Sequence, residues 1–416
     1  MGTLLVIILI AQFILSYIIL LRLDKGFYFQ DIRVAFVSIF ALYTLFWPIS
    51  AELLNFSLDN RAFNLTILSY NLAILAYNIV LITKRSRWLA NANISCTQTK
   101  RSFLWGIFLL AGLIFYSIYY MYSKGIPIFA FNNIDFERME YTRNVNQVWV
   151  ILKFLIAGVG GYLVFYYNQL NLFGKISVIG LLALYIVYQV SLGNRNEYVI
   201  IILFILCYWL CKRKRELNIK WLSILLALFA FSFYITIMRS EDSKELKGNE
   251  AVQLVAQSNE FMFPIQTTYF TIKDNWELRY GETYVVLPIR TIIPRSLQKD
   301  KPESLGSEFI SKTFSSGWSG YAYTPVTEAY LNFGIFGPFI IFLLVGLLLN
   351  SLVVEVRKKG VTYKYLIAYS IIFNFCRGDA SGTIYMILFM WLSYLVMKII
   401  VPNKVSRERV KTVIAG

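Results

Sequence analysis

The chain has 416 residues, of which 57% are apolar and 15% are charged, and its mean hydropathy is +0.58. Water-soluble domains of this length do not reach such a composition, so the sequence predicts a polytopic membrane protein. Forty Lys and Arg residues against 24 Asp and Glu residues give a net charge of +16. In a membrane protein this excess is expected in the loops on one side, rather than on a nucleic-acid-binding surface.

Several classes of chemistry are excluded by what the sequence lacks. The chain has no histidine, which rules out His-ligated zinc or haem and a Ser-His-Asp triad. Its four cysteines form no CxxC pair, and there is no GxxxxGK[ST] phosphate loop. We therefore expect no cofactor and no metal site, and any acid or base must be a carboxylate, Lys, Tyr or Cys.

Eleven apolar segments approach the length of about 20 residues that crosses a bilayer. They lie at roughly 2–21, 34–54, 62–83, 102–122, 148–167, 175–192, 197–211, 221–238, 328–354, 361–375 and 382–401. The first lacks a basic start and a small-residue cleavage site, so we expect it to be a retained span and not a signal peptide.

Positive charge is concentrated in alternate loops, at residues 84–101, 212–220 and 357–364 and in the tail after 398. The positive-inside rule places these segments in the cytoplasm. Eleven spans then put the N-terminus outside and the C-terminus inside. The loops of the opposite side are 123–147, 193–196, 239–327 and 377–382. These loops carry most of the candidate functional residues.

The predicted fold is an all-α polytopic membrane protein that forms a single domain over residues 1–416. The large outer loop, 239–327, is close to neutral and rich in Phe, Tyr and Trp, so we expect it to be ordered against the outer membrane face. Its first part, Glu250–Asp274, has the pattern of an amphipathic helix.

Arginines at the predicted outer face are the first candidate site residues. Arg195 lies in a tight turn between two spans, where it either snorkels or pairs with Glu197, or binds an anion through its planar fork of donors. Arg290 and Arg295 lie in the large loop, with Lys299 close behind. They form either a solvated basic surface or an ordered re-entrant segment that lines a cavity.

Glu328 opens the ninth predicted span, and Thr327 before it can serve as the N-cap of that helix. Glu328 then either complements the helix dipole or acts as a general base at the mouth of a membrane cavity. Gly334, Gly337 and Pro338 are expected to loosen or kink this helix near its outer end.

Arg377 and Asp379 lie in the last outer turn. They either pair with one another or a neighbour, or Arg377 binds the same anion as the other arginines and Asp379 positions it.

Four short motifs resemble the bacterial oligosaccharide repeat-unit polymerases, the Wzy-type family that builds O-antigen and capsule. The resemblance covers roughly residues 120–345. The motifs are Tyr122–Pro127, Leu192–Arg195, Ile293–Arg295 with Lys301–Pro302, and Glu328–Gly334 followed by Gly337. The second motif reads Leu-Gly-Asn-Arg here, in place of the family's commoner Ser-Gly-Ser-Arg.

The resemblance implies a GT-C-like glycosyltransferase in the bacterial cytoplasmic membrane. Such an enzyme moves a growing glycan from undecaprenyl pyrophosphate onto a new lipid-linked repeat unit at the outer face. A flippase and a chain-length regulator are candidate partners. Arg195 and Arg295 match arginines that act on the pyrophosphate, whose developing charge arginines can stabilise without a metal.

Further substrate contacts are expected in the outer loops. Arg290, Lys299 and Arg377 are candidates for binding the lipid pyrophosphate, and Asp379 is a candidate for positioning Arg377. Five aromatic residues either form walls for sugar rings or pack the loop onto the membrane. They are Trp276, Tyr284, Trp318, Tyr321 and Tyr323.

Two alternative functions remain open. An O-antigen ligase uses the same donor, but such ligases usually carry a histidine in the large loop, and this chain has none. A transporter or flippase of lipid-linked oligosaccharide would also place arginines in a cavity. Flippases usually lack an ordered outer loop of this size, and the sequence shows no matching pair of broken helices.

Overall fold

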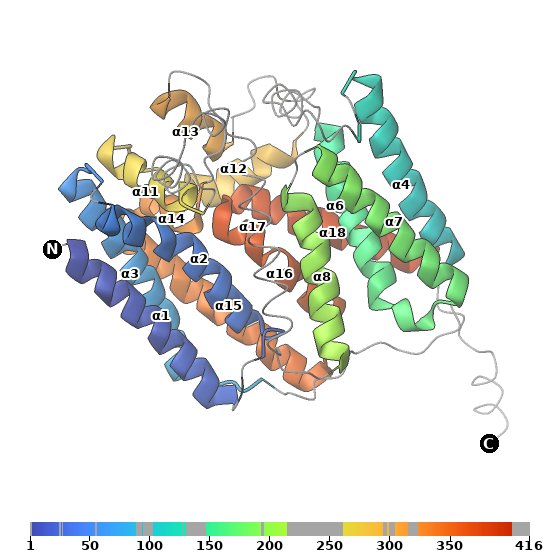
Figure 1. Ribbon diagram of the computed structural model, residues 1–416, viewed down its shortest axis with the longest axis horizontal. Coiled ribbons are helices and arrows are strands. Elements are labelled where there is room, and N and C mark those ends of the chain that lie inside the picture. The colour runs from blue at the N-terminus through green and yellow to red at the C-terminus, as the bar shows by residue number, and fades with distance from the viewer. Residues whose placement is uncertain are drawn as a thin grey trace. The chain divides into compact units, whose positions relative to one another are not determined.

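In the part of the chain that the computed structural model describes, the regular elements are helices (Figure 1). It describes residues 2–24, 26, 28–54, 56–88, 94, 103–126, 128–129, 147–192, 195–213, 261–293, 298, 304–314 and 323–401. Within these ranges the extended pairing is limited to one isolated bridge, between Ile94 and Val361. The all-α prediction is thus confirmed for the described chain.

Eight helical segments of the described chain are long and apolar enough to cross a membrane, which supports a polytopic membrane protein. One of them, Pro325–Lys359, comprises α14 (Pro325–Phe333), the 3-10 turn η3 (Gly334–Phe336) and α15 (Gly337–Lys359). The others are α1 (Gly2–Asp24), α2 (Ile32–Leu53), α3 (Asn60–Thr83), α4 (Leu104–Ser123), α6 (Gln147–Phe165), α7 (Leu172–Ser191) and α18 (Ala380–Ile400).

Three of the eleven predicted spans are not among these eight. The segment 197–211 forms α8 (Arg195–Arg213), which is helical but does not meet the same criteria. The segment 361–375 is interrupted at Ile371 into α16 (Tyr363–Ser370) and α17 (Ile372–Arg377). The segment 221–238 lies outside the described residues. Eleven spans therefore stay a prediction.

The chain divides into two compact units, whereas the sequence predicted a single domain. Unit 1 contains Met1–Asn93, Trp209–Gly360 and Ile371–Tyr385, and unit 2 contains Ile94–Tyr208, Val361–Ser370 and Met386–Gly416. Each unit is built from three separate segments of the chain. The sequence composition therefore gives no sign of a boundary between the two units. Each unit is described separately below.

Helices α1, α2, α3 and α15 form the body of unit 1 (Figure 1). Their inner faces carry aromatic rings that pack on one another: the Phe40 centroid lies 5.0 Å from that of Phe342 and 5.9 Å from that of Tyr70. Their outer faces are apolar and exposed, as at Leu4 (62%) and Leu348 (60%). Apolar residues on both faces are what a helix bundle in lipid requires.

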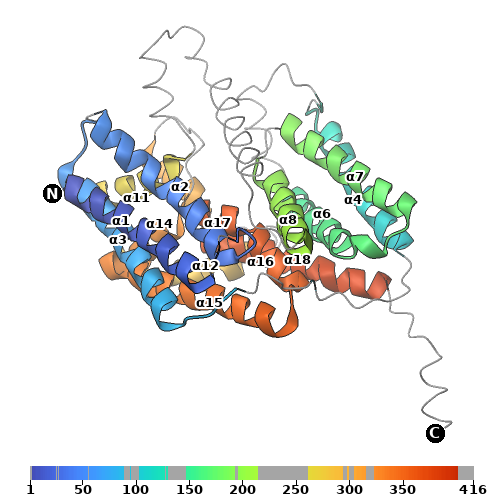
Figure 2. The same cartoon turned by 60° about the horizontal axis from the view of Figure 1, so that its bottom comes forward.

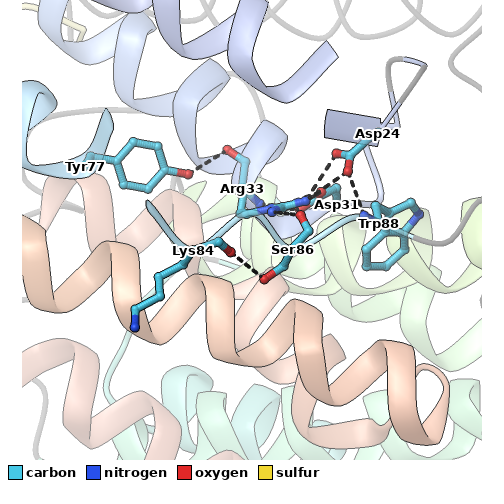
Figure 3. A network of polar contacts seen from close by, with 7 residues as sticks. All are labelled: Asp24, Asp31, Arg33, Tyr77, Lys84, Ser86 and Trp88. Atoms are coloured by element: carbon cyan, nitrogen blue, oxygen red, sulfur yellow. Dashed lines mark hydrogen bonds and ion pairs between the residues drawn. The ribbon is translucent and has the colours of Figure 1, made fainter. Parts of the chain in front are cut away.

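A buried arginine ties together one end of unit 1 (Figure 3). Arg33, which is 0% exposed, forms ion pairs with Asp24 at 3.2 Å and Asp31 at 2.6 Å. Its Nη1 also donates to the Ser86 carbonyl at 2.7 Å, and Asp24 accepts the Trp88 backbone N–H at 2.6 Å. The end of α1, the start of α2 and the segment after α3 are therefore joined by charge-assisted hydrogen bonds.

The opposite end of unit 1 is covered by the described part of the large loop. This part forms α11 (Phe263–Lys273), α12 (Glu282–Ile292) and α13 (Leu305–Thr313) (Figure 1). Helix α11 coincides with the end of the expected helix Glu250–Asp274, and residues 250–260 lie outside the described chain. The Tyr269 hydroxyl accepts the Asp59 backbone N–H at 2.9 Å, which attaches α11 to the start of α3.

Unit 2 contains α4, α6 and α7, which lie side by side (Figure 2). Glycines of α6 allow close approach of its neighbours: a Cβ at Gly158 would lie 3.0 Å from the Met390 Cα, and one at Gly160 would lie 2.8 Å from a Leu182 methyl. Small residues at helix contacts are typical of packing in membranes, where dispersion replaces the hydrophobic effect.

Candidate functional site

The start of α14 brings several predicted site residues together in unit 1. The helix begins at Pro325, and its N-cap is Thr324, whose Oγ1 accepts the Thr327 backbone N–H at 3.0 Å. The prediction that Thr327 is the cap was wrong. Pro325 is the first helical residue, so the cap lies three residues earlier in the chain, at Thr324. The Thr327 hydroxyl instead bonds Thr268 of α11 at 2.7 Å.

Glu328 is 0% exposed, and its carboxyl group reaches across to another helix. Oε2 accepts the backbone N–H of Ala380, the first residue of α18, at 2.7 Å. Oε1 has no partner with hydrogen-bond geometry among the described residues, although the Thr283 side chain lies beside the carboxyl group. Glu328 thus supports the N-terminus of α18, where an acidic group is favoured by the helix dipole.

Asp379 is the N-cap of α18. Its Oδ1 accepts the Gly382 backbone N–H at 2.7 Å, and its carbonyl accepts the Thr383 N–H at 3.2 Å. The backbone N–H of Leu305, the first residue of α13, also lies beside the Asp379 carboxyl group. Burial raises the pKa of Asp379, and these N–H donors counteract part of that rise. Asp379 therefore joins the N-termini of two helices.

Asn332 connects the Glu328 helix to the large loop. It lies one turn after Glu328, and its Nδ2 donates to the Glu328 carbonyl at 2.7 Å and to the Thr283 hydroxyl at 2.6 Å. Its Oδ1 accepts the Gly281 backbone N–H at 2.9 Å. We did not predict this residue, although the spacing of four from Glu328 places both on one face of the helix.

Two tyrosines, the half-buried Tyr284 and the buried Tyr323, adjoin the Glu328 carboxyl group. Burial, and then the charge of Glu328, raise the pKa of Tyr284, whose ring stacks on Phe333 with 6.1 Å between centroids. Burial raises the pKa of Tyr323 as well, and Tyr323 is only 2% exposed in a cluster with Phe309 and Leu331. In this conformation both rings pack inside unit 1 and do not form an open wall for a sugar.

Arg377 lies at the end of α17, three residues before the Ala380 N–H that Glu328 binds. It is partly buried, and its Cζ lies 5.6 Å from the centre of the Phe373 ring. The structure therefore brings Glu328, Asp379 and the turn that carries Arg377 into one place. Arg290 lies in the last turn of α12 and is exposed.

The remaining predicted residues give less information. Arg295, Lys299, Trp318 and Tyr321 lie outside the described residues. Arg195 is the first residue of α8, in unit 2, and its side chain is not among those described.

Unit 2 contains an ion pair that the sequence did not predict. Glu197, one of the partners considered for Arg195, pairs with Lys153 of α6. The Lys153 ammonium also lies 3.9 Å from the centre of the Trp149 ring, a cation–π contact that further stabilises a charge at membrane depth.

Comparison with known proteins adds no relative: no family model, curated protein or solved structure matches the chain. A functional assignment therefore depends on the residues themselves. The carboxyl groups of Glu328 and Asp379 both accept N–H groups at the start of α18, and the start of α13 lies beside Asp379 at the same end of unit 1. Such an arrangement can fix the position of the 377–380 turn and of any side chain that extends from it.

Proposed function

We propose that this protein is a membrane glycosyltransferase that polymerises oligosaccharide repeat units carried on undecaprenyl pyrophosphate. The reaction takes place at the outer face of the bacterial cytoplasmic membrane and yields O-antigen or capsular polysaccharide. The observation that carries the proposal is the hydrogen bond from Ala380 to Glu328. It joins the Glu328–Gly334 motif to the turn of Arg377 and Asp379, and both features were candidates for a role in the reaction from the sequence alone.

The proposed reaction is a single displacement at the anomeric carbon of the donor. A hydroxyl oxygen of the acceptor repeat unit forms the new glycosidic bond, and the bond to the pyrophosphate oxygen breaks. The electron pair leaves with the lipid pyrophosphate, and the hydroxyl proton passes to a base, either a protein carboxylate or the departing phosphate. The protein must therefore stabilise negative charge on the leaving group.

Arginines supply that stabilisation in this proposal. Arg195 and Arg295 are the main ligands of the pyrophosphate, and Arg377, Arg290 and Lys299 are further candidate ligands from the outer loops. The guanidinium fork binds phosphate oxygens bidentately and stays charged at any relevant pH.

Glu328 has a positioning role, since its side chain is fully buried and one oxygen is occupied by the α18 N-terminus. It holds the 377–380 turn, and hence Arg377, in place. Asp379 acts on the same turn from its position as the α18 cap.

A deletion strain tests the proposal in cells. Without the gene, the cell should still flip its lipid-linked repeat unit but display glycans of one repeat only, and the wild-type gene should restore the polymer ladder. Loss of all surface glycan in the deletion strain would instead indicate transport or ligation, and an unchanged ladder would exclude polymerisation.

A further inference from the structure

A polar pocket of about 620 Å³ lies in the described part of the large loop, and neither Glu328 nor Asp379 is among the residues that line it. Its walls come from the segment between α11 and α12, with one residue from α13. Its volume is within the range of about 300–1,000 Å³ that is usual for small-molecule sites. It is lined by Asp274, Asn275, Trp276, Glu277, Leu278, Arg279, Tyr280, Glu282 and Lys312.

The pocket segment has a defined backbone. Asn275 and Tyr280 both have left-handed conformations, with φ of 48° and 47°, which residues other than glycine rarely adopt. The Arg279 backbone N–H donates to the Leu331 carbonyl at 2.9 Å, and the next-but-one N–H, of Gly281, donates to Asn332. The pocket wall is therefore attached directly to α14, the helix that carries Glu328.

Two aromatic rings face this polar pocket. Tyr280 is 82% exposed although its backbone is fixed on both sides, and no packing against the described chain accounts for this position of its ring. Trp276 is partly buried, and the Lys312 ammonium lies 4.7 Å from its ring centre. An exposed ring among fixed polar groups suits a ligand with apolar C–H faces and many hydroxyls.

The charged side chains around the pocket carry more negative than positive charge. Both cations are already bound by Glu308: Arg279 pairs with it, and the Lys312 Nζ lies 2.7 Å from its Oε1. Three carboxylates, Asp274, Glu277 and Glu282, line the same pocket. These groups repel a pyrophosphate, whereas carboxylate oxygens accept hydrogen bonds from sugar hydroxyls.

We propose that this pocket binds uncharged sugar residues of the glycan and excludes its pyrophosphate. The inference rests on the proposed function and specifies which part of the substrate each region takes. The arginines hold the lipid pyrophosphate, and the segment 274–282 holds sugar residues farther along the chain. Because this segment is bonded to α14, a sugar bound there is fixed relative to Glu328 and to the turn that Glu328 supports.

Direct binding tests the inference with the whole protein in lipid nanodiscs. One probe is glycan released from the wild-type strain, freed of phosphate and labelled at its reducing end. The other probe is undecaprenyl pyrophosphate without sugar. Tyr280→Asn removes the ring but keeps a residue that tolerates the left-handed backbone, whereas Tyr280→Phe keeps the ring.

We expect Tyr280→Asn to weaken glycan binding about 5- to 10-fold, the usual range for loss of one aromatic contact, and Tyr280→Phe to bind nearly as wild type. Binding of undecaprenyl pyrophosphate should be unchanged in both. Tyr119→Ala, which removes another exposed tyrosine (66%) from α4 in unit 2, should affect neither probe.

The inference is overturned if the wild type does not bind the phosphate-free glycan, or if Tyr280→Asn leaves its affinity unchanged. Equal weakening of both probes also contradicts it, because the pocket would then not separate sugar from pyrophosphate. Failure of the proposed function has a different signature: the deletion strain would keep its polymer ladder.

Discussion

At the scale of single residues, the most informative side chain is Glu328. It is 0% exposed and bonds the N-terminus of α18. Burial of a carboxyl group costs free energy unless the group is hydrogen-bonded. The bond from the Ala380 N–H offsets part of that cost and indicates that Glu328 holds the start of α18. The residue can be tested by variants that keep or remove the accepting oxygen.

Glu328→Gln keeps an oxygen that can accept the Ala380 N–H, so we expect polymerisation within about threefold of wild type. Glu328→Ala removes this acceptor and leaves a partly buried N–H unpaired, which costs up to about 1–3 kcal/mol. Its polymerisation rate should fall at least about 10-fold, with a lower melting temperature. A fall of 100-fold or more in Glu328→Gln, with an unchanged melting temperature, would show instead that Glu328 is a general base.

Arg33 is the second residue whose removal should be severe. Arg33→Met leaves Asp24 and Asp31 buried without their cation, and breaking a buried ion pair in this way costs about 3–5 kcal/mol. We expect a large loss of folded protein in thermal unfolding of detergent-solubilised membranes. Arg22→Met is the control. Arg22 is exposed on α1, so this variant should have the melting temperature of the wild type. Equal melting of the two variants would exclude the structural role of Arg33.

At the scale of elements, helix starts organise the candidate site. Helices α13, α14 and α18 begin at one end of unit 1. Ser304, Thr324 and Asp379 cap these helices with their own side chains, and Glu328 of α14 accepts a further N–H at the start of α18. The break between α14 and α15 then determines the direction in which the Glu328 helix leaves this cluster. Gly334 has φ of 62°, and the chain passes through one 3-10 turn before α15 starts at Gly337.

Gly337 permits this break, because a Cβ there would lie 1.9 Å from the Ala329 carbonyl oxygen. Backbone cannot move away as a flexible side chain can, so Gly337→Ala should destabilise the protein by at least about 2 kcal/mol. Gly112→Ala is the matched control: that helical glycine has no atom within 4 Å of its Cβ position. Its stability should be unchanged or higher by up to about 1 kcal/mol, because alanine is the better helix former. Similar melting temperatures for both variants would contradict the close contact at Gly337.

Much of the fold was predictable because hydrophobic length is a local signal, and eight of the predicted spans are apolar helices in the structure. A loosening or kink at Gly334, Gly337 and Pro338 was also predictable, since glycine and proline act on their own backbone; the structure has a full interruption there, by the 3-10 turn Gly334–Phe336. The contact of Glu328 with Ala380 was not, because 52 residues separate them in sequence. The cap shifted from Thr327 to Thr324 because Pro325 is a better first helical residue.

At the scale of the whole molecule, the orientation in the membrane can be inferred from the distribution of charge between the two ends of unit 1. In unit 1, the described loop helices α11, α12 and α13 lie at one end, where α3 and α14 begin (Figure 1). Basic residues at the ends of α3 and α15, among them Lys84, Arg357 and Lys358, lie at the other end. From the positive-inside rule we propose that the second end lies in the cytoplasm and the loop helices outside.

Cysteine labelling in a cysteine-free background tests this orientation. Ser307→Cys, exposed on α13, should react with a membrane-impermeant maleimide in intact cells. Lys358→Cys, exposed at the end of α15, should react only after the membrane is opened. The reverse pattern would place the large loop in the cytoplasm and remove the basis for chemistry at the outer face.

The most direct measurement is polymerisation by the purified protein in liposomes, with one lipid-linked repeat unit as both donor and acceptor. We predict a ladder of lipid-linked glycans of increasing length and release of undecaprenyl pyrophosphate in equal amount to the bonds formed. Arg195→Lys and Arg295→Lys should each shorten the ladder strongly, because lysine keeps the charge but loses the bidentate geometry. A repeat unit that remains entirely unextended in the presence of folded wild-type protein would contradict the account.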